Sequence, residues 1–256
     1  MISTSFANNK KGTIRIWSVL LWLGIWQLVA MTLGQDILLV SPLDVMIRLF
    51  DLGITGSFWL SIGYSFSRIA GGFFLATLIG VLFAIFSYRY RLVEEFLAPP
   101  MQTIKATPVA SFVILTLVWI APQNLSVFIS FLMVLPIMYT NVLMGIRSTD
   151  KKLLEMAEVF RVPTYRRIRY IYLSQVLPFF RSACSVALGL GWKAGIAAEV
   201  IGLPQGSIGE MLYQAKIYLD TPDMFAWTLV IIIISVWFEK IVLTLLDRVV
   251  LKMEHL

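Results

Sequence analysis

The sequence predicts an all-α polytopic membrane protein with six transmembrane helices. Three observations lead to this prediction: 59% of the 256 residues are hydrophobic, only 14% are charged, and the mean hydropathy is +0.83. Soluble domains carry charge on about a quarter of their residues. Because one helical crossing needs about 20 apolar residues, the length leaves room for roughly five to seven crossings and no sizeable extra domain.

Six apolar runs are long enough to be these crossings. The first, residues 13–33, resembles a signal peptide, but its length and the lack of a small-x-small pattern before Gly34 predict a retained helix. The others are residues 61–88, 101–120, 125–146, 176–203 and 224–246. We therefore expect one six-helix transmembrane domain over residues 13–250, between an N-terminal segment, 1–12, and a C-terminal tail, 251–256.

The distribution of basic residues predicts the orientation of the chain in a cell membrane. Basic residues concentrate on the side of the two termini, which the positive-inside rule assigns to the cytoplasm. The cytoplasmic residues would be Lys10, Lys11, Arg15, Arg89, Arg91, Arg147, Lys151, Lys152, Arg161, Arg166, Arg167, Arg169, Arg248 and Lys252. The outer side would hold only Arg48, Lys216 and, near a helix start, Arg68.

Two outer segments, residues 35–59 and 204–223, are long enough to hold more than a turn. Ser41-Pro42 punctuates the first and Gly206, Gly209 and Pro222 the second. We expect loops with short amphipathic helices, either as simple connections or as a surface for an external partner.

Several function classes lack the residues that they need. Cys184 is the only cysteine and His255 the only histidine, so we expect no metal site, and we expect no cofactor. No convergent nucleophile and base, and no phosphate-binding loop, occur in the crossings, so we expect no enzyme. The net charge of +6 follows the membrane orientation, and we expect no nucleic acid as a partner.

The longest cytoplasmic stretch, residues 147–178, has the pattern of two short helices. Thr149 or Asp150 can cap the first, whose apolar positions recur every three or four residues, and Pro163 ends it. The apolar positions are Leu153, Leu154, Ala157 and Phe160. Such a helix either lies on lipid headgroups or docks into a groove on a partner, and the pattern alone favours neither.

The same stretch resembles the cytoplasmic loop of ABC importer permeases. That loop reads Glu-Ala-Ala, three residues, Gly, nine residues, Ile-x-Leu-Pro. Glu155, Ala157, Ile171 and Leu173 match it, and Leu177-Pro178 supplies the second Leu-Pro seen in one branch. Further similarity lies in Ser65-Phe-Ser-Arg68-Ile-Ala-Gly71-Gly-Phe, in Leu97-Ala-Pro-Pro-Met-Gln102 with Thr107-Pro108, and in Gly191-Trp-Lys193 with Ala197-Ala-Glu199. The order and spacing of these motifs indicate the branch that imports nitrate, taurine, aliphatic sulfonates and related compounds.

The resemblance implies a type I permease subunit that forms the pathway for a small organic or anionic solute. It implies these partners: cytoplasmic ABC ATPase subunits, an external solute-binding protein, a second permease subunit and the lipid bilayer. It also implies coupling to the ATPase through the loop 147–175, with contact residues Leu154, Glu155, Ala157, Glu158, Phe160 and Arg161. A stand-alone secondary transporter is the alternative, although few intramembrane carboxylates are present to couple protons or sodium.

The loop departs from the family pattern at three positions. Met156 replaces an Ala, Arg161 stands where the family has Gly, and Ser174 stands where it has Pro. Glycine permits a positive φ that a larger residue adopts only at some cost, so the departure at Arg161 bears directly on the geometry of the turn.

Three charged residues fall within the predicted crossings. Lys105 and Lys193 must face the bundle interior or water, because a lysine in lipid is costly, and Glu199 lies nearer the outer interface. The resemblance implies that residues 190–199 line the pathway. Lys193 either attracts an anionic solute or pairs with another helix or its carbonyls, and we favour the pairing because the motif recurs in importers of differing substrates. Small residues, among them Gly71, Gly72, Gly80, Gly189, Gly191 and Gly195, predict close packing of the second and fifth crossings.

Overall fold

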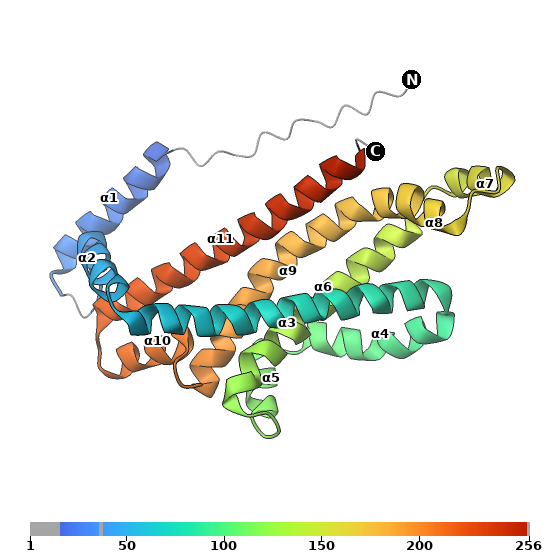
Figure 1. The fold of residues 1–256 in the computed structure, drawn as a ribbon. Coiled ribbons are helices and arrows are strands. Elements are labelled where there is room, and N and C mark those ends of the chain that lie inside the picture. The colour runs from blue at the N-terminus through green and yellow to red at the C-terminus, as the bar shows by residue number, and fades with distance from the viewer. Residues whose placement is uncertain (1–15, 36–37, 255–256) are drawn as a thin grey trace.

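A computed structural model describes residues 16–35 and 38–254, and this described part consists of helices and the turns that connect them (Figure 1). The predicted segment 1–12, the first three residues of the predicted first crossing and the last two residues of the tail lie outside the described residues. The predicted all-helical class is confirmed for the part that the structure describes.

Among the described residues, five helical stretches are long and apolar enough to cross a membrane. They are α1 (Ile16–Leu33), α3 (Gly56–Arg89), α6 (Pro122–Arg147), the continuous helix from α8 (Thr164–Arg167) through a π-helical turn (Ile168–Tyr172) to α9 (Leu173–Gly202), and α11 (Thr221–Glu254). Each overlaps one of the predicted runs over most of its length. Five of the six predicted crossings therefore correspond to single helical stretches.

The remaining run, residues 101–120, was predicted as one helix, and this prediction is wrong. The chain forms α4 (Arg91–Ala106) and α5 (Val109–Thr116), separated at Thr107 and Pro108. Thr107 is extended, with φ −84° and ψ 130°, because the ring of a following proline disfavours the helical region. Pro108 has no N–H with which to continue the ladder of α4.

Helix α6 forms the centre of the bundle, and α3 packs closely along one side of it. A Cβ added to Gly72 would lie 3.0 Å from Cβ of Ser130, and one added to Gly80 would lie 2.9 Å from Cβ of Met138. Residue numbers rise together in these two contacts, so α3 and α6 are parallel.

Helix α9 packs on the other side of α6. A Cβ added to Gly191 would lie 2.7 Å from Val134, and one added to Gly195 would lie 2.5 Å from Oγ of Ser130. Residue numbers rise in α9 as they fall in α6, so these two helices are antiparallel.

The predicted close packing through small residues is confirmed at four of the glycines, Gly72, Gly80, Gly191 and Gly195. At Gly71 and Gly189 no described atom beyond the neighbouring backbone of the same helix lies within 4 Å of an added Cβ. The second and fifth crossings meet mainly through α6, which lies between them.

Helices α4 and α5 lie alongside α6. Glu94 of α4 accepts a hydrogen bond from Arg147 at the end of α6, at 2.5 Å. Further along, Lys105 and Val109 share a cavity wall with Met133 and Pro136, in the middle of α6. The pair α4–α5 therefore runs antiparallel to α6 and connects two parallel helices.

Two short helices lie at the end of the bundle opposite α7 (Lys151–Val159): α2 (Pro42–Gly53) and α10 (Ile208–Ile217) (Figure 1). Both were expected as short helices in the segments 35–59 and 204–223, and both are confirmed. The hydroxyl oxygens of Ser41 and Ser207 cap them by accepting the N–H of Asp44 and Glu210. We call this the α10 end and the opposite one the α7 end.

Candidate functional site

The loop at the α7 end begins with the capped helix that the sequence predicts. The Asp150 carboxylate accepts the N–H of Lys152 at 2.9 Å, so Asp150, rather than Thr149, is the cap. Its own N–H donates to the side-chain oxygen of Gln175 at 3.0 Å. The start of α7 is thereby tied to the start of α9.

The loop turns at Arg161, where the resemblance places a glycine. Arg161 adopts a left-handed backbone, with φ +49°. Its N–H donates to the carbonyl of Glu158 at 2.9 Å, and the next N–H, of Val162, donates to Ala157 at 2.8 Å. These two bonds form a Schellman cap, which normally uses glycine at the left-handed position. Arg161 therefore takes the conformation that a glycine would take, at a cost in backbone strain.

The second half of the loop folds back on the first. The Arg167 guanidinium donates to the carbonyls of Val162, at 3.0 Å, and Ala157, at 3.3 Å. Ser174, where the family has proline, keeps its N–H, and its hydroxyl donates to the carbonyl of Tyr170 at 2.9 Å. The helix consequently continues from Thr164 into α9 without a break.

The residues expected to contact an ATPase divide into two groups. Ala157 is fully buried and Leu154 is half-buried, so both pack within the loop itself. Ala157 was expected to contact an ATPase, but its burial lets the second half of the loop approach closely, and Arg167 donates to its carbonyl. Glu155, Glu158, Phe160 and Arg161 are exposed.

Sequence reasoning missed two members of the exposed face. Val159 is 79% exposed, Phe160 75% and Met156 48%, and these three form an apolar surface on α7 and its end. The predicted stripe extended to Phe160, but Phe160 is the C-cap residue and leaves the helical pattern there. Met156 and Val159 lie one turn apart on the face away from Ala157, and this spacing could have predicted the exposed apolar face.

Glu199, expected near the outer interface, is buried at a junction of three helices. Its Oε2 accepts a hydrogen bond of 2.6 Å from the Ser65 hydroxyl of α3 and one of 3.3 Å from the N–H of Gly209 in α10. Ser65 accepts in turn from the N–H of Ile208 at 2.9 Å. Ser65 and Glu199 are both fully buried. Two of the sequence motifs thus meet in one contact, which holds α10 onto the bundle.

The Gly191-Trp192-Lys193 motif places its three residues in three directions. Gly191 lets α9 approach Val134 of α6. Trp192 is buried, and its indole N–H donates to the carbonyl of Ile231 in α11 at 3.1 Å. Lys193 points outward and is exposed. The motif therefore packs against α6 and α11, and its lysine remains exposed.

Neither membrane lysine pairs within the described chain. Lys193 makes no hydrogen bond or ion pair with a described residue, so the favoured pairing with another helix is not seen within the described chain. Lys105 is exposed as well and lines a cavity of about 360 Å³ with Pro136 and Leu190. Of the segment 190–199, Leu190 and Lys193 are exposed, whereas Glu199 is turned inward.

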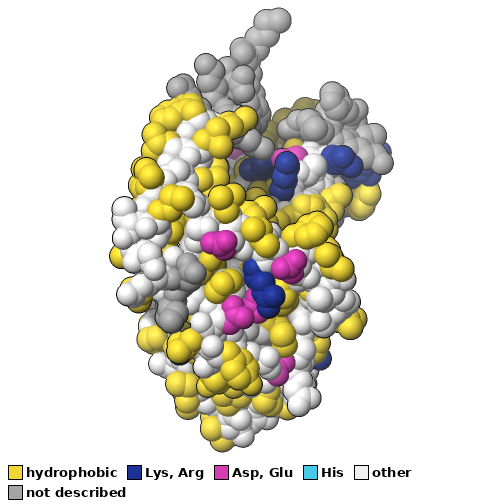
Figure 2. Space-filling view, turned by 90° about the vertical axis from the view of Figure 1, so that its left-hand side faces the viewer, with side chains coloured by type: hydrophobic (Ala, Val, Ile, Leu, Met, Phe, Trp, Pro, Cys, Tyr) yellow, Lys and Arg dark blue, Asp and Glu magenta, His cyan; other side chains and the backbone are white. Residues whose placement is uncertain are grey.

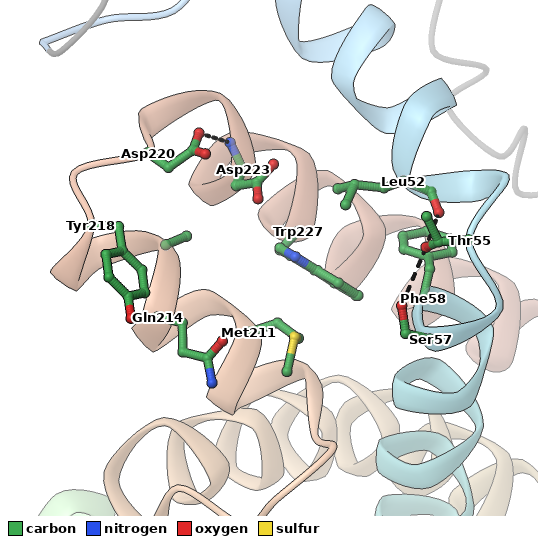
Figure 3. Close-up of a pocket in the computed structure, with 11 residues that line it drawn as sticks. Leu52, Thr55, Ser57, Phe58, Met211, Gln214, Tyr218, Asp220, Asp223 and Trp227 are labelled. Carbon is green, nitrogen blue, oxygen red and sulfur yellow. Dashed lines mark hydrogen bonds between the residues drawn. The ribbon is translucent and has the colours of Figure 1, made fainter.

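A second cavity, of about 270 Å³, opens at the α10 end between the start of α3, α10 and the start of α11 (Figure 3). Asp220, Asp223 and Tyr218 lie on one side of it and Phe58 on the other. Arg48 of α2 donates two hydrogen bonds to the Asp223 carboxylate and ties α2 to α11. Figure 2 shows this end face on, with acidic side chains gathered beside basic ones in a largely hydrophobic surface.

Comparison with known proteins identifies the family. Residues 76–254 match the model of the binding-protein-dependent transport system inner membrane component. The chain is 27% identical to SsuC of Bacillus subtilis (strain 168), a permease protein named for aliphatic sulfonates transport, over 90% of this chain and 83% of the relative. It is 23% identical to the taurine transport system permease protein TauC of Escherichia coli (strain K12), over 90% and 86%.

A third relative is the nitrate import permease protein NrtB of Synechococcus elongatus (strain ATCC 33912 / PCC 7942 / FACHB-805), 27% identical over 76% of this chain and 73% of the relative. The family match covers more than half of the chain and sets aside the stand-alone secondary transporter. The chain therefore belongs to the binding-protein-dependent transport system inner membrane component family: it is a multi-pass inner-membrane permease subunit of an ABC importer, without catalytic activity of its own, that works with separate ATPase and binding-protein partners.

Proposed function

We propose that the chain crosses the membrane six times, with α4 and α5 together as the third crossing and the α7 end and both termini in the cytoplasm. Basic residues support this orientation: the described residues of the α7 end include Arg89, Arg91, Arg147 and the basic loop, whereas those toward the α10 end are Arg48, Arg68 and Lys216. The family assignment to the inner membrane is compatible with either orientation, so the proposed orientation rests on the charge distribution.

The length of α4 and α5 supports this additional crossing. Their 16 and 8 residues rise about 36 Å, which spans a hydrocarbon core of about 30 Å. They connect parallel helices, so the chain must return across the bundle between Arg89 and Pro122. The break at Pro108 is tolerable in a membrane because neighbouring helices and water can satisfy the freed backbone groups.

The proposal of how transport is coupled to ATP hydrolysis rests on the exposed apolar face of α7. Met156, Val159 and Phe160 present hydrophobic surface at the cytoplasmic end, with Glu155 and Glu158 at its edge. A small apolar core with a charged rim is the pattern of a protein interface. We infer that an ATPase subunit covers this face and that Leu154 and Ala157 act indirectly, by holding the loop in shape.

The transport pathway would lie between two permease subunits. Lys105 and Lys193 stand on the outer face of this subunit, on α4 and α9, where lipid contact would be costly. A second subunit, identical or homologous, would cover that face and enclose water. Alternating access would then come from movement of the two subunits as the ATPases close and open.

The solute is a small oxyanion. Relatives named for nitrate, taurine and aliphatic sulfonates support this class, since a nitrate or a sulfonate group carries a delocalised negative charge on oxygen atoms. The binding protein would deliver it at the α10 end, which lies on the side opposite the ATPase (Figure 1).

Copurification of the ATPase tests the coupling face. A Phe160→Asp variant, expressed in the native host with a tag, should insert normally but lose most of the ATPase that copurifies with the parent. The matched control is Phe50→Asp, which changes an equally exposed phenylalanine, 71% against 75%, at the α10 end. Retention of the ATPase by Phe160→Asp would refute the coupling face, and its loss in both variants would mean that the effect is not local.

A further inference from the structure

Two lysines and a helix N-terminus lie on one exposed face at the middle of the bundle. Lys105 lies in the last turn of α4, and the cavity of about 360 Å³ that it lines is also bounded by Pro136 and Ile137 of α6 and Leu190 of α9. Lys193 follows Leu190 by three positions on α9, so it lies on the same face about 4.5 Å further toward the α10 end. Neither lysine has a hydrogen-bonding or ionic partner among the described residues.

At the break between α4 and α5, the N-terminus of α5 adds a third source of positive potential, opposite the partial negative C-terminus of α4. Helix α5 begins at Val109, and Thr107, Pro108 and Val109 all line this cavity. No side chain caps α5, so the N–H groups of its first turn have no partner within the helix. The N-terminus of a helix carries a partial positive charge that favours an anion.

The other side chains that line the cavity do not neutralise the lysine charge. The described residues that line the cavity include no carboxylate, and apart from Lys105 and Thr107 their side chains are apolar. Glu199, six residues after Lys193, points to the other side of α9 and bonds to Ser65. Within the described residues of the cavity wall, no carboxylate opposes the lysines, and the opposing charge is the partial negative charge of the α4 C-terminus.

We propose that this cavity is an anion-binding site of the permease, in which the Lys105 ammonium and the N-terminus of α5 hold a small oxyanion and Lys193 attracts it from the outer side. The assignment rests on the proposed function, because it requires that this face borders the pathway between two subunits. In other transporters, discontinuous helices near the middle of the membrane direct the N-terminus of a half-helix at an anionic group of the substrate.

A charge-selective reaction at a thiol placed between the two lysines tests the site. Leu190 lines the cavity and is 41% exposed, and the native Cys184 is 1% exposed, so a Leu190→Cys variant has one accessible thiol in the described part of the chain. The purified complex in nanodiscs is treated with two methanethiosulfonates of similar size, one with a sulfonate and one with a trimethylammonium group. The measured quantity is the ratio of the two reaction rates.

We expect this ratio to fall about threefold when either Lys105→Met or Lys193→Met is added, since a positive charge within about 10 Å acts oppositely on the two reagents. Lys105→Arg should preserve the ratio. Lys240→Met, which removes an exposed lysine from α11, is the matched control and should leave the ratio unchanged. Ethanesulfonate should slow labelling only while Lys105 is a cation.

Three results would overturn the proposal: no reaction with either reagent, the same ratio with and without the two lysines, or protection by ethanesulfonate that survives Lys105→Met. The amount of ATPase in the same preparation distinguishes a failure of the anion site from a failure of the proposed function. An unchanged ratio with the ATPase present refutes the anion site alone, whereas a preparation of the parent chain without ATPase refutes the proposed function.

Discussion

The two ends of the bundle are held together in different ways. At the α10 end, Ser65, Glu199 and Gly209 join three helices through buried hydrogen bonds. At the α7 end, the loop is held mainly by its own backbone and by Arg167, and its apolar residues Val159 and Phe160 remain exposed. The α10 end is held by hydrogen bonds between helices, whereas the loop at the α7 end is held mainly by hydrogen bonds within itself.

This difference indicates where a substitution should affect the fold and where it should affect coupling. Buried hydrogen bonds between helices are expensive to lose, because each leaves a donor or acceptor without water. A loop that satisfies its own backbone keeps its outer face free for another protein. We therefore expect changes at the α10 end to alter stability and changes on the outer face of the loop to alter assembly.

The largest effect should follow from Gly209→Ala. An added Cβ at Gly209 would lie 2.6 Å from the backbone nitrogen of Val200 and even closer to Glu199, so α10 must shift. We expect a loss of about 1–3 kcal/mol in the free energy of unfolding, measured by thermal or denaturant unfolding in detergent.

The control for this change is Gly189→Ala, on α9, where nothing lies within 4 Å of an added Cβ. It should be neutral or stabilise by up to about 1 kcal/mol, because alanine favours a helix over glycine. Equal destabilisation by both variants would show that the junction at Glu199 is not specially tight.

An intermediate effect, of opposite sign, should follow from Arg161→Gly. Glycine adopts the observed φ of +49° without a Cβ penalty, so the loop should gain about 1 kcal/mol. Hydrogen exchange of the Val162 amide should slow about fivefold. Arg166→Gly, in helical α8, should instead speed exchange. Faster exchange in Arg161→Gly would mean that the arginine side chain, rather than the turn, stabilises the loop.

The smallest effect should appear as a pH dependence at the cytoplasmic side. Glu94 lies in the first turn of α4, before the apolar run that begins at residue 101. The hydrogen bond from Arg147 lowers the pKa of the Glu94 carboxyl, so ionised Glu94 stabilises the folded chain. This contribution is present above the unfolded glutamate pKa of about 4.3 and is lost as the pH falls through the lowered folded value.

The Glu94 side chain is 30% exposed, so the contribution should not exceed about 1 kcal/mol. Unfolding free energies measured from pH 7 to pH 3 should fall less steeply for Glu94→Gln than for the parent. Identical slopes would show that the pair contributes nothing to stability.

The site was only partly predictable from the sequence. The helix capped at Asp150 and the exposed Glu155 and Phe160 followed from local patterns. The burial of Ala157 did not, because it depends on the chain folding back through Arg167. Likewise, Glu199 and Lys193 both looked like charges in a crossing, and only the packing of α9 shows that one is buried and the other exposed.

The all-helical membrane class, five of the spanning helices and the short helices α2 and α10 could be predicted from local sequence, because apolar run length, capping residues and proline act locally. The sequence also placed the motifs of the family in order. The break of the third apolar run into α4 and α5 is also local, because Pro108 causes it, although the sequence-based prediction overlooked it. By contrast, the position of α6 between α3 and α9 and the contact of Ser65 with Glu199 are seen only in the folded chain. These features depend on contacts between residues far apart in the chain, which a local pattern does not contain.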